Sequence, residues 1–524
     1  MTDAYKNRRT FAIISHPDAG KTTLTEKLLY FSGAIRLAGE VKARGDRRRA
    51  RSDWLAIEQK RGISVTTSAM TFEHSGCIFN LLDTPGHEDF SEDTYRTLTA
   101  VDSAVMVIDA AKGIESQTKK LFEVCRLRDI PIMTFINKVD REGRDPFDLM
   151  DEIADQLALD VSPRVFPAGQ GVGFKACYDM AHHRLLLEGD GGSGKFGRAV
   201  DLSGVDDPEF DAIVGANEAA AAREAMGLAA EGYAAFDLEQ YRHGALTPIY
   251  FGSALKEFSV AELLRDIARF APCPRAQKAG DVVVEPSDNS VSGFVFKVQA
   301  NMDPNHRDRV AFVRLSSGEF KRGMKLKVSR TEKLIAVNNP IFFLAQERNL
   351  AEEAVAGDII GIPNHGALGV GDTLSEKDGV RFSGLPDFAP EIIRRVRLDD
   401  PMKSKQMKRA MTALAEEGAA QVFTPTIGAD FYVGVVGALQ LDVIEERLKA
   451  EYGVAAAMEA CGFDAVRWLS GEEPALRKFI SLNGSAIAHD RYGSPVYLAR
   501  SQWEAGYAEQ KNPDVKFLKT RERA

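Results

Sequence analysis

The sequence predicts three consecutive folding units: an α/β domain, a small β-barrel and a C-terminal α+β domain. At 524 residues the chain is too long for one hydrophobic core. Its first half joins short apolar runs to segments with helical periodicity, which is typical of strands and helices packed in an α/β sheet. Closely spaced short strand signals follow, and then two helical segments mixed with strands. We expect boundaries at 1–275, with an inserted subdomain at about 165–246, at 276–386 and at 387–524.

Composition places the chain among ordinary globular proteins, with 44% hydrophobic and 27% charged residues. No segment approaches the roughly 20 uninterrupted apolar residues of a membrane span. The polar N-terminus leads directly into the first apolar run, so we expect no signal peptide, no membrane partner and a cytoplasmic location. The five isolated cysteines predict reduced thiols without a zinc site. We expect a monomer.

The first motif is a loop between the apolar run Phe11–Ile14 and a helical segment at 24–31. Gly20 lets the chain bend, Lys21 can reach the β- and γ-phosphates, and Thr22 offers a hydroxyl to magnesium. The alternative is a helix N-cap with a coincidental Gly-Lys-Thr, and the usual opening glycine is replaced by a serine. The expected phosphate-binding residues are Ser15, His16, Pro17, Asp18, Ala19, Gly20, Lys21, Thr22 and Thr23.

A polar, arginine-rich stretch then runs from Phe31 to Arg61 and predicts a loop. Ser64 follows it, just before the second strand. A hydroxyl there can sense the γ-phosphate through magnesium, although a plain turn serine explains the position as well.

The apolar run Cys77–Leu82 ends in Asp83, Thr84, Pro85, Gly86 and His87. Ligands of parallel sheets bind at this carboxyl edge. Asp83 can hold magnesium through water, and the Gly86 amide can contact the γ-phosphate if the chain comes close. His87 can orient the attacking water. The alternative interpretation of His87 is an ordinary surface histidine without a catalytic role.

The base is specified by Asn137, Lys138, Val139 and Asp140, which follow the strand signal 131–136. A carboxylate at Asp140 accepts from guanine N1–H and the 2-amino group, which adenine cannot match. Asn137 would steady the base, and the Lys138 stem would stack on it. After a strand at 248–252, the backbone of Ser253, Ala254 and Leu255 can contact guanine O6. Four motifs in order, each after an apolar strand, predict a P-loop GTPase domain.

The region from 163 to 247 interrupts this domain with two candidate strands, 174–179 and 183–187, and an alanine-rich helix at 216–235. Its Gly191–Lys195 resembles a second phosphate loop only superficially, because no buried strand precedes it; a hairpin tip is the interpretation. Downstream, barrel strands are expected at 293–298, 309–315, 323–328, 359–362 and 371–374. The last unit offers two amphipathic helices, about 403–417 and 439–452.

The net charge of −9 argues against binding nucleic acid through a global field. Two local basic clusters could contact RNA, or could be solvated faces. They are Arg44, Arg47, Arg48, Arg49 and Arg51, and then Arg394, Arg395, Arg397, Lys403, Lys405, Lys408 and Arg409.

With these motifs in place, the chain resembles the translational GTPases, and within them the class II release factors of bacteria. The likeness rests on Phe11–Asp18, on Arg61–Ser64, on Asp83–Asp102, whose histidine after D-x-x-G marks the family, and on Gly293–Ala311. It implies GTP/GDP binding with Mg2+ held by Thr22, Ser64 and Asp83, and catalysis assisted by His87. It also implies docking on the ribosome and removal of class I release factors after peptide release. The third unit would resemble the third domain of elongation factor G. Elongation factors generally carry threonine where this chain has Ser64, so its hydroxyl is kept without the methyl.

A GTP-dependent ribosome-binding stress or assembly switch, whose hydrolysis is incidental, is the alternative. His87 and the long similar stretches favour the termination GTPase.

Overall fold

The computed structural model describes residues 3–35, 65–169, 171–188, 198–300, 309–344, 347–428 and 430–522. The expected magnesium ligand Ser64, the arginine cluster 44–51 and the hairpin tip 191–195 lie outside the described residues.

The first unit is a ten-stranded sheet with the order β2-β3-β1-β4-β5-β10-β6-β7-β8-β9. Its centre is parallel from β3 to β6, and β2 adds an antiparallel edge. The central strands are almost wholly buried, as expected when helices cover both faces. The parallel strands are β1 (Arg8–Ser15), β3 (Cys77–Asp83), β4 (Ser103–Asp109), β5 (Ile132–Asn137), β10 (Leu246–Phe251) and β6 (Asp160–Ala168), and β2 is Ser68–His74.

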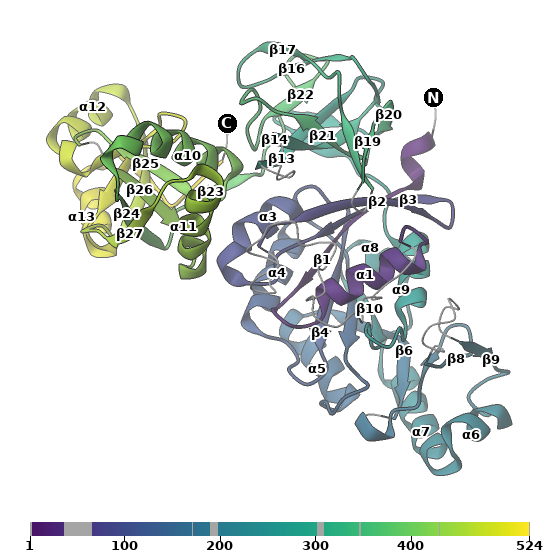
Figure 1. The fold of residues 1–524 in the computed structure, drawn as a ribbon. Helices are drawn as coiled ribbons and strands as arrows, with labels where there is room; N and C mark the ends of the chain where they lie inside the picture. Colours follow the sequence, from purple (N-terminus) through teal and green to yellow (C-terminus); the bar gives the residue numbers. More distant parts are fainter. Residues whose placement is uncertain are drawn as a thin grey trace.

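Two groups of helices pack on this sheet (Figure 1). α1 (Lys21–Phe31) contacts α9 (Val260–Phe270), whereas α4 (Ser116–Leu127) contacts α3 (Ser91–Leu98) and α5 (Pro146–Leu157). Short 3-10 turns are η1 (Asp3–Asn7), η2 (Glu88–Phe90) and η3 (Gly171–Gly173).

The inserted region continues the main sheet. β7 (Ala176–Asp179) pairs with β6, and β8 (Arg184–Leu186) and β9 (Ala199–Asp201) follow in antiparallel order. The two expected strands therefore form and pair. Buried residues of this region belong to the same hydrophobic core as the parallel strands. Its helices are α6 (Pro208–Val214), α7 (Ala216–Gly232) and α8 (Leu238–Arg242).

The second unit is β-rich, as predicted. Eight strands in the order β17-β16-β22-β13-β14-β21-β18-β19 surround an apolar core, and a ribbon of β15 and β20 packs beside β14. The strands are β13 (Ser292–Ala300), β14 (Arg309–Ser317), β15 (Glu319–Lys321), β16 (Lys325–Val328), β17 (Lys333–Ala336), β18 (Ile341–Leu344), β19 (Glu347–Leu350), β20 (Glu353–Val355), β21 (Ile359–Pro363) and β22 (Thr373–Ser375), after a linker ribbon of β11 (Gln277–Ala279) and β12 (Val282–Val284).

Buried charges join the first two units. The Arg314 guanidinium is 1% exposed, lies 2.5 Å from the Asp102 carboxylate, and donates to the Gly357 carbonyl. Arg8 pairs with Asp358 at 3.1 Å through both carboxylate oxygens. Apolar side chains of the barrel also extend the core of the first unit, so this interface is held by packing as well as charge.

We expect Arg314→Ala to lower the free energy of unfolding by about 3 kcal/mol or more, because it leaves a buried Asp102 carboxylate without its cation. Calorimetry of the purified protein measures this loss. Arg477→Ala is the control, since its pair with Glu473 is exposed and such pairs contribute little. Equal, small effects of both substitutions would contradict a structural role for the buried pair.

The C-terminal unit contains two α/β halves on one eight-stranded sheet, β27-β24-β26-β25-β29-β30-β28-β31. α10 (Ser404–Glu417) and α11 (Ala438–Tyr452) match the two expected helices. The structure adds α12 (Glu473–Leu482) and α13 (Gln502–Lys511), which the sequence interpretation missed. The strands are β24 (Ile392–Leu398), β25 (Gln421–Pro425), β26 (Phe431–Val435), β27 (Ala456–Ala460), β28 (Ala465–Gly471), β29 (Ile487–His489), β30 (Pro495–Ala499) and β31 (Val515–Leu518); β23 (Pro386–Phe388) pairs with β32 (Thr520–Glu522), and η4 (Pro401–Lys403) and η5 (Gly484–Ala486) are short turns.

Figure 1 shows this unit against the side of the first one that carries α3 and α4. All five cysteines are free thiols. In the part of the chain that the structure describes, no group of three or more His, Cys, Asp or Glu side chains is arranged to hold a metal ion. Over the same residues, none of the helices combines the length and apolarity needed to cross a bilayer.

Candidate functional site

The predicted motifs meet at the carboxyl edge of the parallel sheet. Ser15, Asp83 and Asn137 are the last residues of β1, β3 and β5, and residues 253–255 follow β10 after a single residue. Because these strands are parallel, their following loops converge on one edge. Contacts there join distant segments: Lys21 meets Asp83 across 62 positions, and Asn137 meets the Ala19 carbonyl across 118.

The phosphate loop depends on the absence of a side chain at Gly20. Its φ is 96°, in the left-handed region. A Cβ there would overlap the Asn137 amide nitrogen. That nitrogen donates to the Ala19 carbonyl at 2.8 Å, so the base-recognition segment holds the phosphate loop in place.

Asn137 and Lys138 tie three loops together. Asn137 Oδ1 accepts from the Ala254 amide at 2.9 Å. Lys138 Nζ donates to the Asp18 carbonyl and to Asp109 Oδ2, each at 2.6 Å. Burial raises the pKa of Asp109, but hydrogen bonds from Lys138 and from the Ala111 amide more than offset this, so its pKa lies below the ordinary value.

Asp140 is half-buried, and its carboxylate forms no hydrogen bond or ion pair with any residue the structure describes. It is therefore available to a ligand at this edge. Val139 is buried, and its amide donates to the Gly252 carbonyl at 3.2 Å. The Ala254 amide expected at guanine O6 is engaged by Asn137 here. Ser253 is buried and Leu255 is 58% exposed.

The surroundings of Asp83 show whether its carboxylate is suited to hold a magnesium ion. Its carboxylate is 1% exposed and contacts the Lys21 ammonium through Oδ1. Among the described residues Oδ2 has no hydrogen-bond partner although it is buried. A buried carboxylate oxygen left over in this way fits a hydrated divalent cation. Thr22 and Thr23 lie half-buried in the first turn of α1.

His16 and Ser15 are buried at the start of the loop, whereas Pro17 and Asp18 are exposed and Ala19 is buried. The Ser15 hydroxyl donates to the His16 carbonyl at 2.9 Å. The His16 ring lies 2.5 Å from Glu115, a residue that the sequence interpretation did not select. Burial lowers the pKa of His16, and Glu115 only partly offsets this.

The loop after Asp83 is anchored to β1. Thr84 Oγ1 donates to the Ile13 carbonyl at 2.8 Å, and the Pro85 carbonyl accepts from Thr94. A Cβ on Gly86 would lie 3.5 Å from the His16 carbonyl oxygen, an ordinary contact. The protein's own packing therefore does not require glycine at this position.

His87 is the N-cap of η2, where its Nδ1 accepts from the Asp89 amide at 3.2 Å. This bond assigns the proton of a neutral ring to Nε2. The side chain is 36% exposed, and its ring packs on Phe90. The imidazole thus has one nitrogen fixed by the protein and one that can face a reactant.

Asp109 and Glu115 are the site residues that sequence reasoning missed. Asp109 ends an apolar strand, as Asp83 does, so that pattern could have found it. Glu115 carries no local signal, because its contact with His16 spans 99 positions.

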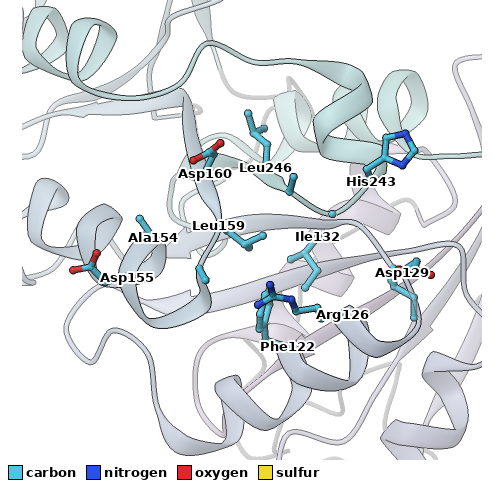
Figure 2. A pocket seen from close by; sticks show the side chains of 14 residues that line it. Phe122, Arg126, Asp129, Ile132, Ala154, Asp155, Leu159, Asp160, His243 and Leu246 are labelled. Carbon is cyan, nitrogen blue, oxygen red and sulfur yellow. The ribbon is translucent and has the colours of Figure 1, made fainter.

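A separate cavity of about 690 Å³ lies beside the first residues of β6 and β10, Asp160 and Leu246. Figure 2 shows Arg126, Asp129, Asp155 and His243 around it. It therefore opens at the amino edge of these strands, opposite the edge where the motifs meet.

Comparisons with known proteins agree with this geometry. Residues 6–273 match the elongation factor Tu GTP binding domain, residues 290–377 match elongation factor G domain 2, and residues 382–509 match the C-terminal domain of class II release factor RF3. A crystal structure of ttk003000868 from Thermus thermophilus shares the fold, with a TM-score of 0.70 and 24% identity. This match covers 88% of the present chain and 68% of that chain.

The GTP-binding domain indicates a hydrolase acting on GTP, and the release-factor domain implies the ribosome as a partner. The chain belongs to the translational GTPases and is of the class II release factor type.

Proposed function

We propose that this GTPase acts in translation termination, where its GTP form promotes dissociation of a class I release factor from the ribosome after peptide release. The observation that supports this most is the match of residues 382–509 to a class II release factor domain. We further propose that residues 1–275, 276–386 and 387–524 are its three domains.

The proposed roles follow the contacts at the sheet edge. Residues 15–23 hold the phosphates. Lys21 contacts Asp83, so the Lys21 ammonium and a cation held by Asp83 would lie close enough to neutralise the charge of the same phosphate groups. Thr22, Ser64 and Asp83 would hold Mg2+, which when bound neutralises phosphate charge. Asp140 selects guanine, and residues 253–255 support the base. His87 orients the attacking water.

Such a switch acts only through different affinities for two ribosomal states. A tenfold bias towards release of the class I factor requires roughly 1.4 kcal/mol of coupling, within the usual range between linked sites.

The test is the departure of a fluorescently labelled class I release factor from post-termination ribosomes. We expect faster departure with this protein and GTP than with GDP or without the protein. Equal rates under all nucleotide conditions would contradict the termination role. If GTP hydrolysis is still stimulated by ribosomes in that case, a GTP-dependent ribosomal stress or assembly switch becomes the better account.

The basic cluster of the C-terminal domain divides into two parts. Arg395 and Arg397 pair with Glu459 at 2.8 and 3.0 Å, so their charge is largely compensated. Lys405, Lys408 and Arg409 are exposed on α10, and no described residue forms an ion pair with them. The α10 group is therefore the stronger candidate for contact with ribosomal RNA.

We expect Lys405→Glu, Lys408→Glu and Arg409→Glu together to weaken ribosome association and to lower its salt dependence, by about two to three in the log–log slope. Filter binding across a salt series measures both. Reversal of Lys478, Lys511 and Lys516, three exposed lysines in the other half of the domain, changes the net charge equally and is the control. The same loss in both triple variants would assign the effect to net charge.

A further inference from the structure

The segment that carries His87 is bonded directly to the C-terminal domain. Asp89 Oδ2 accepts from the Leu439 amide at 2.7 Å, in the first turn of α11. Asp89 Oδ1 lies 3.2 Å from His87 Nδ1, which already accepts from the Asp89 amide, so the carboxylate borders the neutral ring without accepting a proton from it. One carboxylate therefore touches both the candidate catalytic ring and a helix 350 positions further along the chain.

The contact between the Asp89 carboxylate and the N-terminus of α11 is electrostatically favourable. The first amides of a helix lack intrahelical acceptors and carry partial positive charge, so a carboxylate there is stabilised. Gln440 satisfies the amides of Val436 and Gly437. Asp89 satisfies the Leu439 amide, so it supplies a cap that α11 does not obtain from its own sequence.

Gly437 makes this approach possible. A Cβ at Gly437 would overlap the carboxyl carbon of Asp89. Its backbone, with φ −138° and ψ 161°, is extended and open to any residue. Glycine is therefore required at Gly437 by the contact with Asp89 and not by backbone strain.

Neighbouring contacts also hold the turn that carries His87 and Asp89 against the C-terminal domain. Phe90 packs with Val65, Leu439 and Val443 in a small apolar cluster. Beyond it, Gln421 Nε2 donates to Glu92 at 3.0 Å. The turn bearing His87 and Asp89 is thus clamped between its own domain and α11.

We propose that Asp89 is a positioning residue for His87, and that docking of the α11 N-terminus on Asp89 sets the orientation of the His87 ring. This inference rests on the proposed role of His87 in hydrolysis. Asp89 itself contacts neither nucleotide nor water in the reaction. Small displacements of a reacting group are costly, since about 1 Å of misplacement can slow a reaction roughly 100-fold.

The test places the change in the C-terminal domain, where the nucleotide motifs are untouched. We expect Gly437→Ala to lower kcat for ribosome-stimulated GTP hydrolysis about tenfold or more, with little change in KM for GTP. Gly462→Ala is the matched control, because a Cβ there meets no atom within 4 Å. It should leave kcat unchanged. Thermal unfolding of each variant confirms that it is folded.

A double-mutant cycle separates positioning from general destabilisation. Asp89→Ala removes the side chain that the new Cβ would meet, so Gly437→Ala should cost almost nothing further in that background. Asp89→Asn keeps an acceptor oxygen for the Leu439 amide and should retain more activity than Asp89→Ala. The proposal would be overturned if the losses in kcat from Gly437→Ala and Asp89→Ala were additive, or if Gly437→Ala left kcat unchanged. Faster GTP hydrolysis by the Gly437→Ala variant in the absence of ribosomes would also overturn it.

Ribosome-stimulated GTP hydrolysis by the unmodified protein separates failure of the proposed function from failure of the positioning role of Asp89. If ribosomes do not stimulate its GTP hydrolysis, the proposed function fails and the positioning role fails with it. If stimulation is normal and the Gly437 and Asp89 variants match it, only the positioning role is wrong.

Discussion

Replacing His87 with alanine is expected to slow ribosome-stimulated GTP hydrolysis about 1,000-fold while leaving GTP and GDP affinity nearly intact. The structure supplies the reason for this separation. The His87 ring bonds within its own turn, to the Asp89 amide, whereas the phosphate loop is held by Asn137 and Lys138. Losing the imidazole therefore removes a group that can orient water without releasing the loop that binds phosphates.

Single-turnover hydrolysis on ribosomes and fluorescent GDP titration measure the two quantities. His243→Ala is the control, because that histidine is 80% exposed and lies at the opposite edge of the sheet. Weaker nucleotide binding with unchanged turnover per bound GTP would assign His87 to structure.

The nucleotide motifs could be predicted because each is local. An apolar strand of six to eight residues ends at Ser15, Asp83 or Asn137, and the following residues must then lie at the carboxyl edge. Local sequence patterns also predicted the β-rich unit, from closely spaced strand signals, and the helices α10 and α11, from their amphipathic periodicity. Fold class followed from the same alternation of elements.

Two short helices of the C-terminal unit were missed, and each has a single fully buried residue. In α12 only Phe479 is fully buried, and in α13 only Ala505. α13 therefore lacks the periodic apolar stripe on which sequence interpretation depends. α12 does carry one, at Leu476, Phe479 and Ile480, so its pattern could have predicted this short helix.

Contacts between distant segments could not be predicted either, because no local sequence pattern indicates them. The bond from Leu439 to Asp89 spans 350 positions, and nothing near Gly437 indicates that its missing side chain makes room for a carboxylate. Likewise, Arg395 and Arg397 count as free cations in the sequence, yet Glu459 on the neighbouring strand β27 pairs with both.

Replacing Asp140 with asparagine is expected to weaken GTP binding about 100-fold or more and to favour xanthosine triphosphate. The carboxylate would accept two hydrogen bonds from guanine, and bonds to charged groups contribute roughly 1.5 to 3 kcal/mol each. In the variant an amide N–H faces the guanine 2-amino group, donor against donor. Xanthine carries an oxygen at that position, so the same amide gains a partner.

Asp140 suits this test because its carboxylate has no bond to any described residue, so its removal leaves the loop contacts intact. Asn137 would not serve, since it holds both the Ala19 carbonyl and the Ala254 amide, and its loss should weaken every nucleotide alike. Competition binding with GTP, XTP and ATP measures the preference, with Asp155→Asn on the remote end of α5 as the control. Equal weakening of GTP and XTP by Asp140→Asn, or competition by ATP as strong as that by GTP against the unmodified protein, would show that guanine is selected elsewhere.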